Sequence, residues 1–279
     1  MEQVKELRLA VLIDADNIPY HNVKGMMEEI AKYGTPTFKR IYADWTKPHV
    51  TGWKNVLLEN AITPIQQYSY TTGKNSSDSA MIIDAMDILY TGRVDGFCIV
   101  SSDSDFTKIA TRLREAGMKV FGIGEKKTPV PFISACDKFI YLEILKSAPR
   151  ETRKVPLPVR KRAPHKAGSQ AVAAPAEAAT GETAMPVSAP EAQTAETISK
   201  IDAALIKLIA DSINDIADED GWAFLGSLGS LLLKKQPDFD PRNYGFSKLV
   251  SLIKKITEFE VDERKTNRNN ITHVYVKVK

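Results

Sequence analysis

Short apolar segments alternate with amphipathic segments over the first half of the chain. Segments typical of helices, with apolar residues recurring every three or four positions, are VKGMMEEIAKYG, VTGWKNVLLENA, SAMIIDAMDILYTG and FTKIATRLREAG. Between them lie strand-like runs, namely LAVLID, FKRIYADW, ITPIQQYSY, GFCIVSS, MKVFGIG and KFIYLEIL. Strands separated by helices are usually parallel, and uniformly apolar strands indicate a sheet covered on both faces. Residues 1–147 are therefore predicted to form an α/β domain with a doubly wound parallel sheet.

The apolar periodicity stops at residue 148. The first part of the following segment is basic and rich in proline, and the second part, AVAAPAEAATGETAMPVSAPEAQTAE, lacks large apolar residues. Such a composition buries too little apolar surface to offset the entropy lost on ordering. Residues 148–197 are therefore predicted to be a disordered linker.

Periodicity returns in residues 198–279. Three helical segments are predicted, ISKIDAALIKLIADSINDIAD, AFLGSLGSLLLKKQ and FSKLVSLIKKI. The remaining stretch, FEVDERKTNRNNITHVYVKVK, has the pattern of two strands around a polar tip. Three helices closed by a hairpin indicate a small winged-helix-like α+β domain.

Composition narrows the class of protein. The net charge is only +3, so nucleic-acid binding would depend on local basic patches. The two cysteines form no CxxC pair, which argues against a disulfide framework and a zinc site. The N-terminus lacks the form of a signal peptide, and no apolar run approaches the roughly 18 residues of a membrane span. We expect a soluble, cytoplasmic protein that does not enter a membrane.

Acidic residues gather where the predicted strands end. In a doubly wound sheet, ligands bind outside the carboxyl ends of the strands. The residues at these positions are Asp14, Asp16 and Asn17 after the first strand, Asp103 and Asp105 after the fourth, and Asp78 at the start of the helix between them. Carboxylates held close together repel one another unless a cation screens them. Ligation by oxygen alone favours Mg²⁺ or Mn²⁺, which prepare water for attack on phosphorus, so a phosphoester substrate is predicted.

Several of these residues also have purely structural interpretations. Asp16 or Asn17 is suited to cap a first helix that begins near Pro19, and Asp105 is suited to cap the helix FTKIATRLREAG. Asp78 would complement a helix dipole. Capping explains Asp14 and Asp103 least well, because each follows an apolar strand directly.

Three blocks of the first domain together resemble the NYN family, a group of PIN-like nucleases: LIDADNI, KNSSDSAMIIDAMDILY and CIVSSDSDFTKIATRLREAGMKVFGIG. The resemblance implies a metal-dependent ribonuclease, most simply an endonuclease, with Mg²⁺ or Mn²⁺ as cofactor and RNA as substrate. It implies catalytic metal ligands at Asp14, Asp78, Asp103 and Asp105, and auxiliary roles for Asp16, Asn17, Ser102, Lys74 and Asp84. Asp84 follows Asp78 by six residues, about 240° around a helix, so we expect Asp84 to be structural. Where family members often have KGVD, this chain has KNSSD, which affects substrate contacts of the loop rather than the ligand.

The segment RNYGFSKLVSLIKKITEFEV is similar to the LOTUS or OST-HTH module, which accompanies some NYN domains. The resemblance implies RNA binding, although some animal members bind a helicase, so a protein partner is the alternative. The residues suited to a basic, aromatic RNA-binding surface are Tyr244, Lys248, Lys254, Lys255, Arg264, Lys265 and Arg268. The structural alternative is a solvated helix face.

Two other functions remain open at this point. Asp14 and Asp16 after an apolar strand also resemble the nucleophile motif of haloacid-dehalogenase phosphatases, but the Thr or Val expected after the second aspartate is missing. A non-catalytic RNA-binding scaffold is the second alternative. Oligomeric state and RNA preference cannot be inferred from the sequence.

Overall fold

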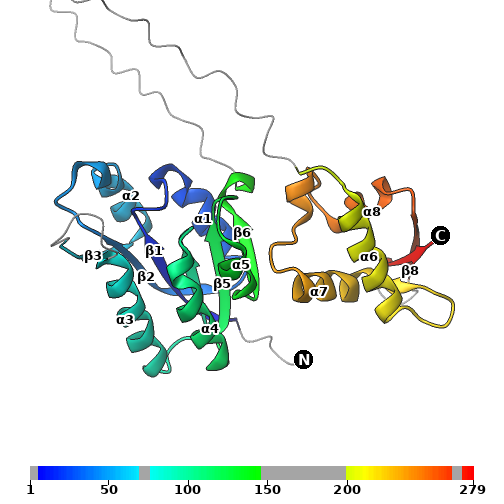
Figure 1. Ribbon diagram of the computed structural model, residues 1–279, viewed down its shortest axis with the longest axis horizontal. Coiled ribbons are helices and arrows are strands. Elements are labelled where there is room, and N and C mark those ends of the chain that lie inside the picture. Colours follow the sequence, from blue (N-terminus) through cyan, green and yellow to red (C-terminus); the bar gives the residue numbers. More distant parts are fainter. Residues whose placement is uncertain (1–5, 69–75, 146–198, 266–271) are drawn as a thin grey trace, which may run out of the picture. The chain divides into compact units, whose positions relative to one another are not determined.

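The computed structural model describes residues 6–68, 76–145, 199–265 and 272–279 (Figure 1). The linker predicted at residues 148–197 lies outside the described residues, as do Lys74 and Arg268. None of the described helices has the length and apolar character needed to cross a membrane.

Residues 8–141 contain a sheet of six parallel strands. The strands are β1 (Arg8–Asp14), β2 (Thr35–Ala43), β3 (Thr63–Gln66), β4 (Gly96–Val100), β5 (Lys119–Gly124) and β6 (Lys138–Tyr141). Their order across the sheet is β3-β2-β1-β4-β5-β6. The chain therefore builds outward from β1 in one direction, returns, and continues from β4 in the other direction. The predicted doubly wound α/β fold is confirmed, and its switch point lies between β1 and β4.

Helices cover both faces of this sheet. One face packs against α1 (Val23–Ile30) and α2 (Trp53–Asn60), and the other packs against α3 (Ser76–Tyr90), α4 (Thr107–Glu115) and α5 (Val130–Ser134). Side chains alternate between the faces along a strand. In β1, Val11 and Ile13 belong to the α1/α2 core, whereas Ala10 and Leu12 belong to the α3/α4 core. The apolar runs of the sequence thus reflect burial on both sides.

The last predicted strand, KFIYLEIL, is shorter in the structure. β6 ends at Tyr141, and a single 3-10 turn follows at Leu142–Ile144. Leu142 and Leu145 both enter the α1/α2 core. In a 3-10 turn, side chains three residues apart lie on the same side, whereas in a strand they would point to opposite faces. The turn therefore buries both leucines in one core.

Residues 203–265 and 272–278 form helices and an antiparallel sheet. The elements are α6 (Ala203–Ile216), β7 (Ala223–Phe224), α7 (Leu225–Lys235), α8 (Leu249–Lys255), β8 (Phe259–Lys265) and β9 (Thr272–Val278), with strand order β7-β9-β8. The Asp202 side chain caps α6 by accepting a hydrogen bond from the Leu205 amide at 2.8 Å. The predicted winged-helix-like α+β architecture is confirmed.

β7 was not expected from the sequence, which predicts that the second helix begins at Ala223. In the structure α7 begins at Leu225, and Ala223 and Phe224 pair instead with Val276 and Tyr275 of β9. Ala223 is fully buried in the core of this region. Pairing with a strand some fifty positions away outweighs local helix propensity here, and local periodicity carries no signal for it.

Candidate metal centre

The carboxyl ends of β1 and β4 meet at the switch point of the sheet. The two strands are neighbours in register, with Ile13 beside Val100, so Asp14 and Ser101 leave the sheet next to each other. By strand alternation, Asp14 follows Leu12 and Ser101 follows Ile99 on the α3/α4 face. This face is therefore where the side chains of α3 and α4 meet the strand ends.

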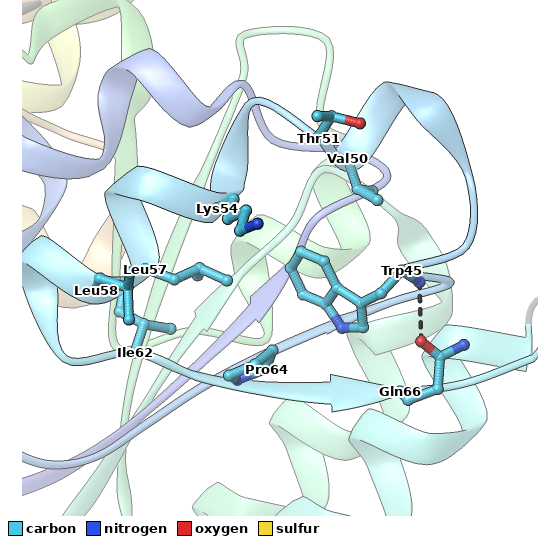
Figure 2. A pocket seen from close by; sticks show the side chains of 9 residues that line it. All are labelled: Trp45, Val50, Thr51, Lys54, Leu57, Leu58, Ile62, Pro64 and Gln66. Atoms are coloured by element: carbon cyan, nitrogen blue, oxygen red, sulfur yellow. Dashed lines mark hydrogen bonds between the residues drawn. The ribbon is translucent and has the colours of Figure 1, made fainter.

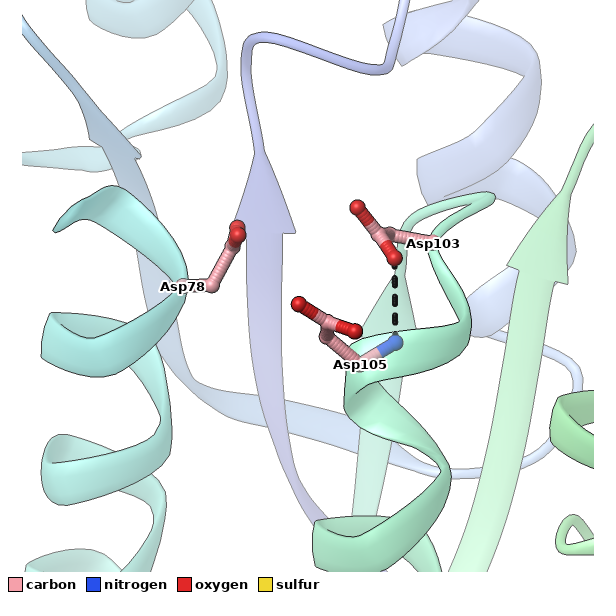
Figure 3. A group of neighbouring side chains, drawn as sticks. All are labelled: Asp78, Asp103 and Asp105. Atoms are coloured by element: carbon pink, nitrogen blue, oxygen red, sulfur yellow. Dashed lines mark hydrogen bonds between the residues drawn. The ribbon is translucent and has the colours of Figure 1, made fainter. Parts of the chain in front are cut away.

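Three carboxylates converge at this point (Figure 3). Asp78 lies in the first turn of α3, and Asp103 and Asp105 lie between the end of β4 and the start of α4. One carboxylate oxygen from each lies within 4.8 Å of the others. The structure thus brings together three of the four residues predicted as metal ligands. We call Asp78, Asp103 and Asp105 the acidic group.

The acidic group reaches from the interior to the surface. Asp78 is 7% exposed, Asp103 is half-buried and Asp105 is exposed. Asp103 Oδ1 accepts a hydrogen bond from the Asp105 amide at 3.0 Å and so caps the 3-10 turn Ser104–Phe106. Of these two aspartates the cap is therefore Asp103, and the capping interpretation of Asp105 was wrong. Asp105 forms the solvent side of the acidic group.

The electrostatics of Asp78 reflect its surroundings. Burial is the largest cause that raises the pKa of Asp78. The negative charges of Asp14, Asp103, Asp105 and Asp16 raise the pKa further, to about 7. Both effects disfavour a carboxylate in this position. A bound cation would reverse the balance, because its charge stabilises the ionised form of each neighbouring carboxyl group.

Asp14 borders the acidic group without belonging to it. It is only 1% exposed. Asp14 Oδ1 accepts a hydrogen bond from the Asp16 amide at 3.1 Å, and Oδ2 accepts from Asn17 Nδ2 at 2.6 Å and from Ser101 Oγ at 2.8 Å. Burial raises the pKa of Asp14, and these hydrogen bonds lower it. Both oxygens of Asp14 are therefore engaged by the protein.

Asp16 and Asn17 do not cap the first helix. The 3-10 turn Tyr20–Asn22 precedes α1, and its N-cap is Pro19, with no side-chain cap. Asn17 donates to Asp14 instead, and Asp16 accepts a hydrogen bond from Ser77 Oγ at 3.2 Å. The loop after β1 is thereby joined to the first turn of α3, which carries Asp78.

Ser101 is the residue of this site that sequence reasoning missed. It is fully buried, donates to Asp14, and accepts a hydrogen bond from the Asp103 amide at 3.1 Å. Ser102, chosen from the sequence, points elsewhere, and its Oγ accepts from the Glu125 amide after β5 at 2.9 Å. Alternation along β4 is the available signal, but it becomes usable only once β4 is known to pair with β1.

Asp84 lies away from the acidic group, farther along α3. It accepts hydrogen bonds from the Arg40 guanidinium and the Tyr42 hydroxyl, both on β2. These contacts join α3 to the sheet, which is a structural role.

An apolar pocket of about 560 Å³ lies between α2 and the edge strand β3 (Figure 2). Its walls include Trp45, Leu57, Leu58 and Pro64, and none of its lining residues is acidic. The Trp45 ring is held in place because Nε1 donates to the Ile65 carbonyl oxygen at 3.0 Å. The pocket lies on the α2 side of the sheet, whereas the acidic group lies on the α3 side. It is therefore not part of the metal centre.

The basic and aromatic residues predicted to bind RNA differ in their surroundings. The Tyr244 ring is half-buried with its centroid 6.4 Å from that of Phe239, and burial raises its pKa. Lys254 pairs with Glu263 at 2.6 Å. Lys248 and Lys255 are exposed on either end of α8.

The matches to protein families agree with this geometry. The NYN domain family matches residues 8–143, which span the sheet and every residue of the acidic group. The OST-HTH/LOTUS domain family matches residues 196–271. The chain therefore carries an NYN domain followed by an OST-HTH/LOTUS domain. NYN domains are a nuclease family and OST-HTH domains are associated with RNA binding, so both resemblances noted in the sequence are confirmed.

Two solved structures are similar to parts of the chain. One, from Vibrio parahaemolyticus, is titled a protein of unknown function; it shares 20% identity, covering 50% of this chain and 94% of that one, with a TM-score of 0.42. The other is an uncharacterized protein from Nitrosomonas europaea, with 33% identity over 35% of this chain and 91% of that one and a TM-score of 0.27. No curated protein matches the sequence.

Proposed function

We propose that this protein is a metal-dependent ribonuclease that hydrolyses RNA phosphodiester bonds as an endonuclease. The acidic group would hold one Mg²⁺ or Mn²⁺ ion, with Asp14 beside it. The OST-HTH domain would bind the RNA and, tethered through residues 148–197, raise the concentration of substrate near the NYN domain.

One observation carries this proposal: three carboxylate oxygens within 4.8 Å of one another at the switch point of an NYN sheet. The donor set fits a hard cation, because every ligand atom is a carboxylate oxygen and the group includes no Cys or His. The raised pKa of Asp78 supports the same conclusion, since the site disfavours its own negative charge until a cation is present.

The residues around the acidic group would fix the positions of its carboxylates. When bound, such an ion lowers the pKa of a water molecule and stabilises the leaving oxygen. Ser101 donates to Asp14 and orients the Asp103 amide, so it holds the ends of β1 and β4 at a constant separation. Asp105 gives the group an exposed side from which an internal phosphodiester can approach without a free chain end.

Cleavage and metal binding test the proposal together. The full chain is incubated with a labelled single-stranded RNA in Mn²⁺, in Mg²⁺ and in EDTA, and Mn²⁺ binding is measured by calorimetry. We expect cleavage only with metal. Asp105→Asn removes one ligand from the exposed side of the group, so it is expected to weaken Mn²⁺ binding and lower the cleavage rate by at least about 100-fold.

Asp87→Asn is the matched control, because Asp87 is an exposed aspartate on α3 outside the acidic group. It should leave both measurements unchanged. Cleavage that persists in EDTA would contradict metal dependence. RNA binding without cleavage in either metal would favour the non-catalytic scaffold. A phosphoaspartate trapped at Asp14 would favour the phosphatase, although the burial of Asp14 and its three hydrogen bonds do not suit a nucleophile.

A further inference from the structure

The three-stranded sheet of the OST-HTH domain has two unlike faces. Ala223, Val261 and Val276 point to the side on which α6, α7 and α8 pack, and they belong to the core of the domain. Because side chains alternate, their neighbours in β7, β8 and β9 point the other way. We call that other side the outer face.

The outer face is aromatic and carries charges of both signs. An antiparallel sheet with one solvated face usually carries polar residues there. Here, by strand register and ring contacts, the outer face carries the rings of Trp222, Phe224, His273 and Tyr275, the cations Arg264 and Lys277, and the acids Glu260 and Asp262. Phe224 is 41% exposed, and its ring centroid lies 5.8 Å from that of Tyr275. A large apolar side chain exposed in this way contributes little to the stability of the fold.

Two cations lie against these rings. The Arg264 guanidinium is 4.4 Å from the centroid of Tyr275 and 5.4 Å from that of Trp222. The Lys277 ammonium is 5.9 Å from the Trp222 centroid and donates to the Asp220 carbonyl oxygen at 2.7 Å. Arg264 is also paired with Asp262 at 2.7 Å, which holds its side chain across the face. The rings and cations therefore form one continuous surface.

This combination matches the chemistry of unpaired nucleotides. Aromatic rings on a sheet offer flat surfaces on which bases stack, and every base has such a face, so stacking tolerates many sequences. Lysine and arginine beside the rings attract the phosphates between the bases. Bases inside a duplex are already stacked on each other and cannot use these rings.

We propose that the outer face binds single-stranded RNA, with bases stacked on Phe224 and Tyr275 and phosphates held by Arg264 and Lys277. The inference deepens the proposed function and rests on RNA being the substrate. It keeps Arg264 from the set predicted from the sequence, and it moves the other contacts from α8 and Tyr244 to the strands of the OST-HTH domain.

Fluorescence anisotropy of a short labelled oligouridine tests this inference with the full chain in EDTA, so that no cleavage occurs. The variants are Phe224→Leu and Tyr275→Leu, which keep apolar side chains in the sheet but remove the aromatic face. Each is expected to raise the Kd for oligouridine about fivefold or more, since base stacking on one ring contributes at least that much. Binding of a blunt RNA duplex should change far less.

Tyr90→Leu is the matched control, because Tyr90 is a 74% exposed aromatic residue on α3 of the NYN domain. It should leave oligouridine binding unchanged. Tyr244→Leu is a second comparison, expected to leave binding unchanged if the outer face is the site. Circular dichroism melting checks that each variant is folded.

Equal Kd values for wild type, Phe224→Leu and Tyr275→Leu would overturn the inference, and the outer face would then be a candidate for contact with another protein. An equal loss of duplex and oligouridine binding would also overturn it. The result is separate from the ribonuclease proposal, because metal-dependent cleavage and Mn²⁺ binding at the acidic group are measured independently of this face.

Discussion

The acidic group and the outer face differ in how far their charges are balanced. In the acidic group, carboxylates of the same charge lie within 4.8 Å of one another, and the pKa of Asp78 rises to about 7. On the outer face, Arg264 is balanced by Asp262 and by two aromatic rings. A site with unbalanced charge has a strong requirement for one ligand, a cation. A site with balanced charges gains affinity from many small contacts, so each substitution there should lower the affinity only by a moderate amount.

The largest effect is expected at the acidic group. Asp103→Asn removes one carboxylate oxygen from the acidic group, and we expect single-turnover cleavage to fall by at least about 100-fold. The melting temperature should hold, because Asn can still accept the hydrogen bond from the Asp105 amide. Asp14→Asn should also abolish cleavage. Full activity in either variant would remove that residue from the catalytic set.

A graded effect is expected on the outer face. Replacing Arg264 with Gln should raise KM for single-stranded RNA several-fold and leave kcat nearly unchanged, because uniform binding is lost rather than chemistry. The slope of log Kd against log salt should fall by about one, as for one phosphate contact. Lys207→Gln, on α6, is the control. A large loss of kcat would mean that the two sites are not separable.

Asp84 provides a contrast with Asp78 on the same helix, because the charge of Asp84 is balanced by the Arg40 guanidinium. Asp84→Ala leaves the Arg40 guanidinium and the Tyr42 hydroxyl without their partner. We expect the free energy of unfolding to fall by about 1–3 kcal/mol, measured by urea denaturation, with Mn²⁺ binding retained. Asp87→Ala is the control, expected to change stability by less than about 0.5 kcal/mol. Lost metal binding in Asp84→Ala would contradict its structural role.

A gain of stability is expected when Asp78 is neutralised. The pKa of Asp78 is raised from its ordinary value of 3.8 to about 7, so the folded protein without metal disfavours the ionised form. The contribution of the Asp78 carboxyl group to the free energy of unfolding is fully present below the pKa of the unfolded state. It is lost as pH rises through the pKa of the folded state. Asp78→Asn removes this loss, and it should therefore raise the melting temperature above pH 7 by about 2–4 °C per kcal/mol relieved.

Below the unfolded pKa the same variant should melt with the wild type, because both carry a neutral group at position 78. Saturating Mn²⁺ should reverse the order at neutral pH, since only the wild type has the full set of ligands. Differential scanning fluorimetry across pH, with and without Mn²⁺, makes both comparisons. A melting temperature that falls at neutral pH without metal would mean that Asp78 is stabilised by contacts other than the acidic group.

Short sequence patterns predict many of the strands, helices and site residues of this protein. The apolar runs of β1 and β4 are readable from the sequence because burial on both faces leaves no polar positions. The sequence also predicts the three members of the acidic group, Asp78, Asp103 and Asp105, because residues that follow a strand or begin a helix can be recognised from a short stretch of sequence. The separation of Asp84 from Asp78 followed from helix geometry alone. Each of these depends on interactions within a few residues of the chain.

Other features depend on which strands become neighbours. Ser101, rather than Ser102, joins Asp14 to Asp103, and this follows from the pairing of β1 with β4 across the switch point. β7 forms because Ala223 pairs with Val276 of β9. The same pairing places Phe224 beside Tyr275 on the outer face. The sequence by itself determined the order of elements and the acids at their ends. Only the tertiary structure decided which side chains meet, because strand order and register are set by packing energies between distant segments rather than by any local pattern.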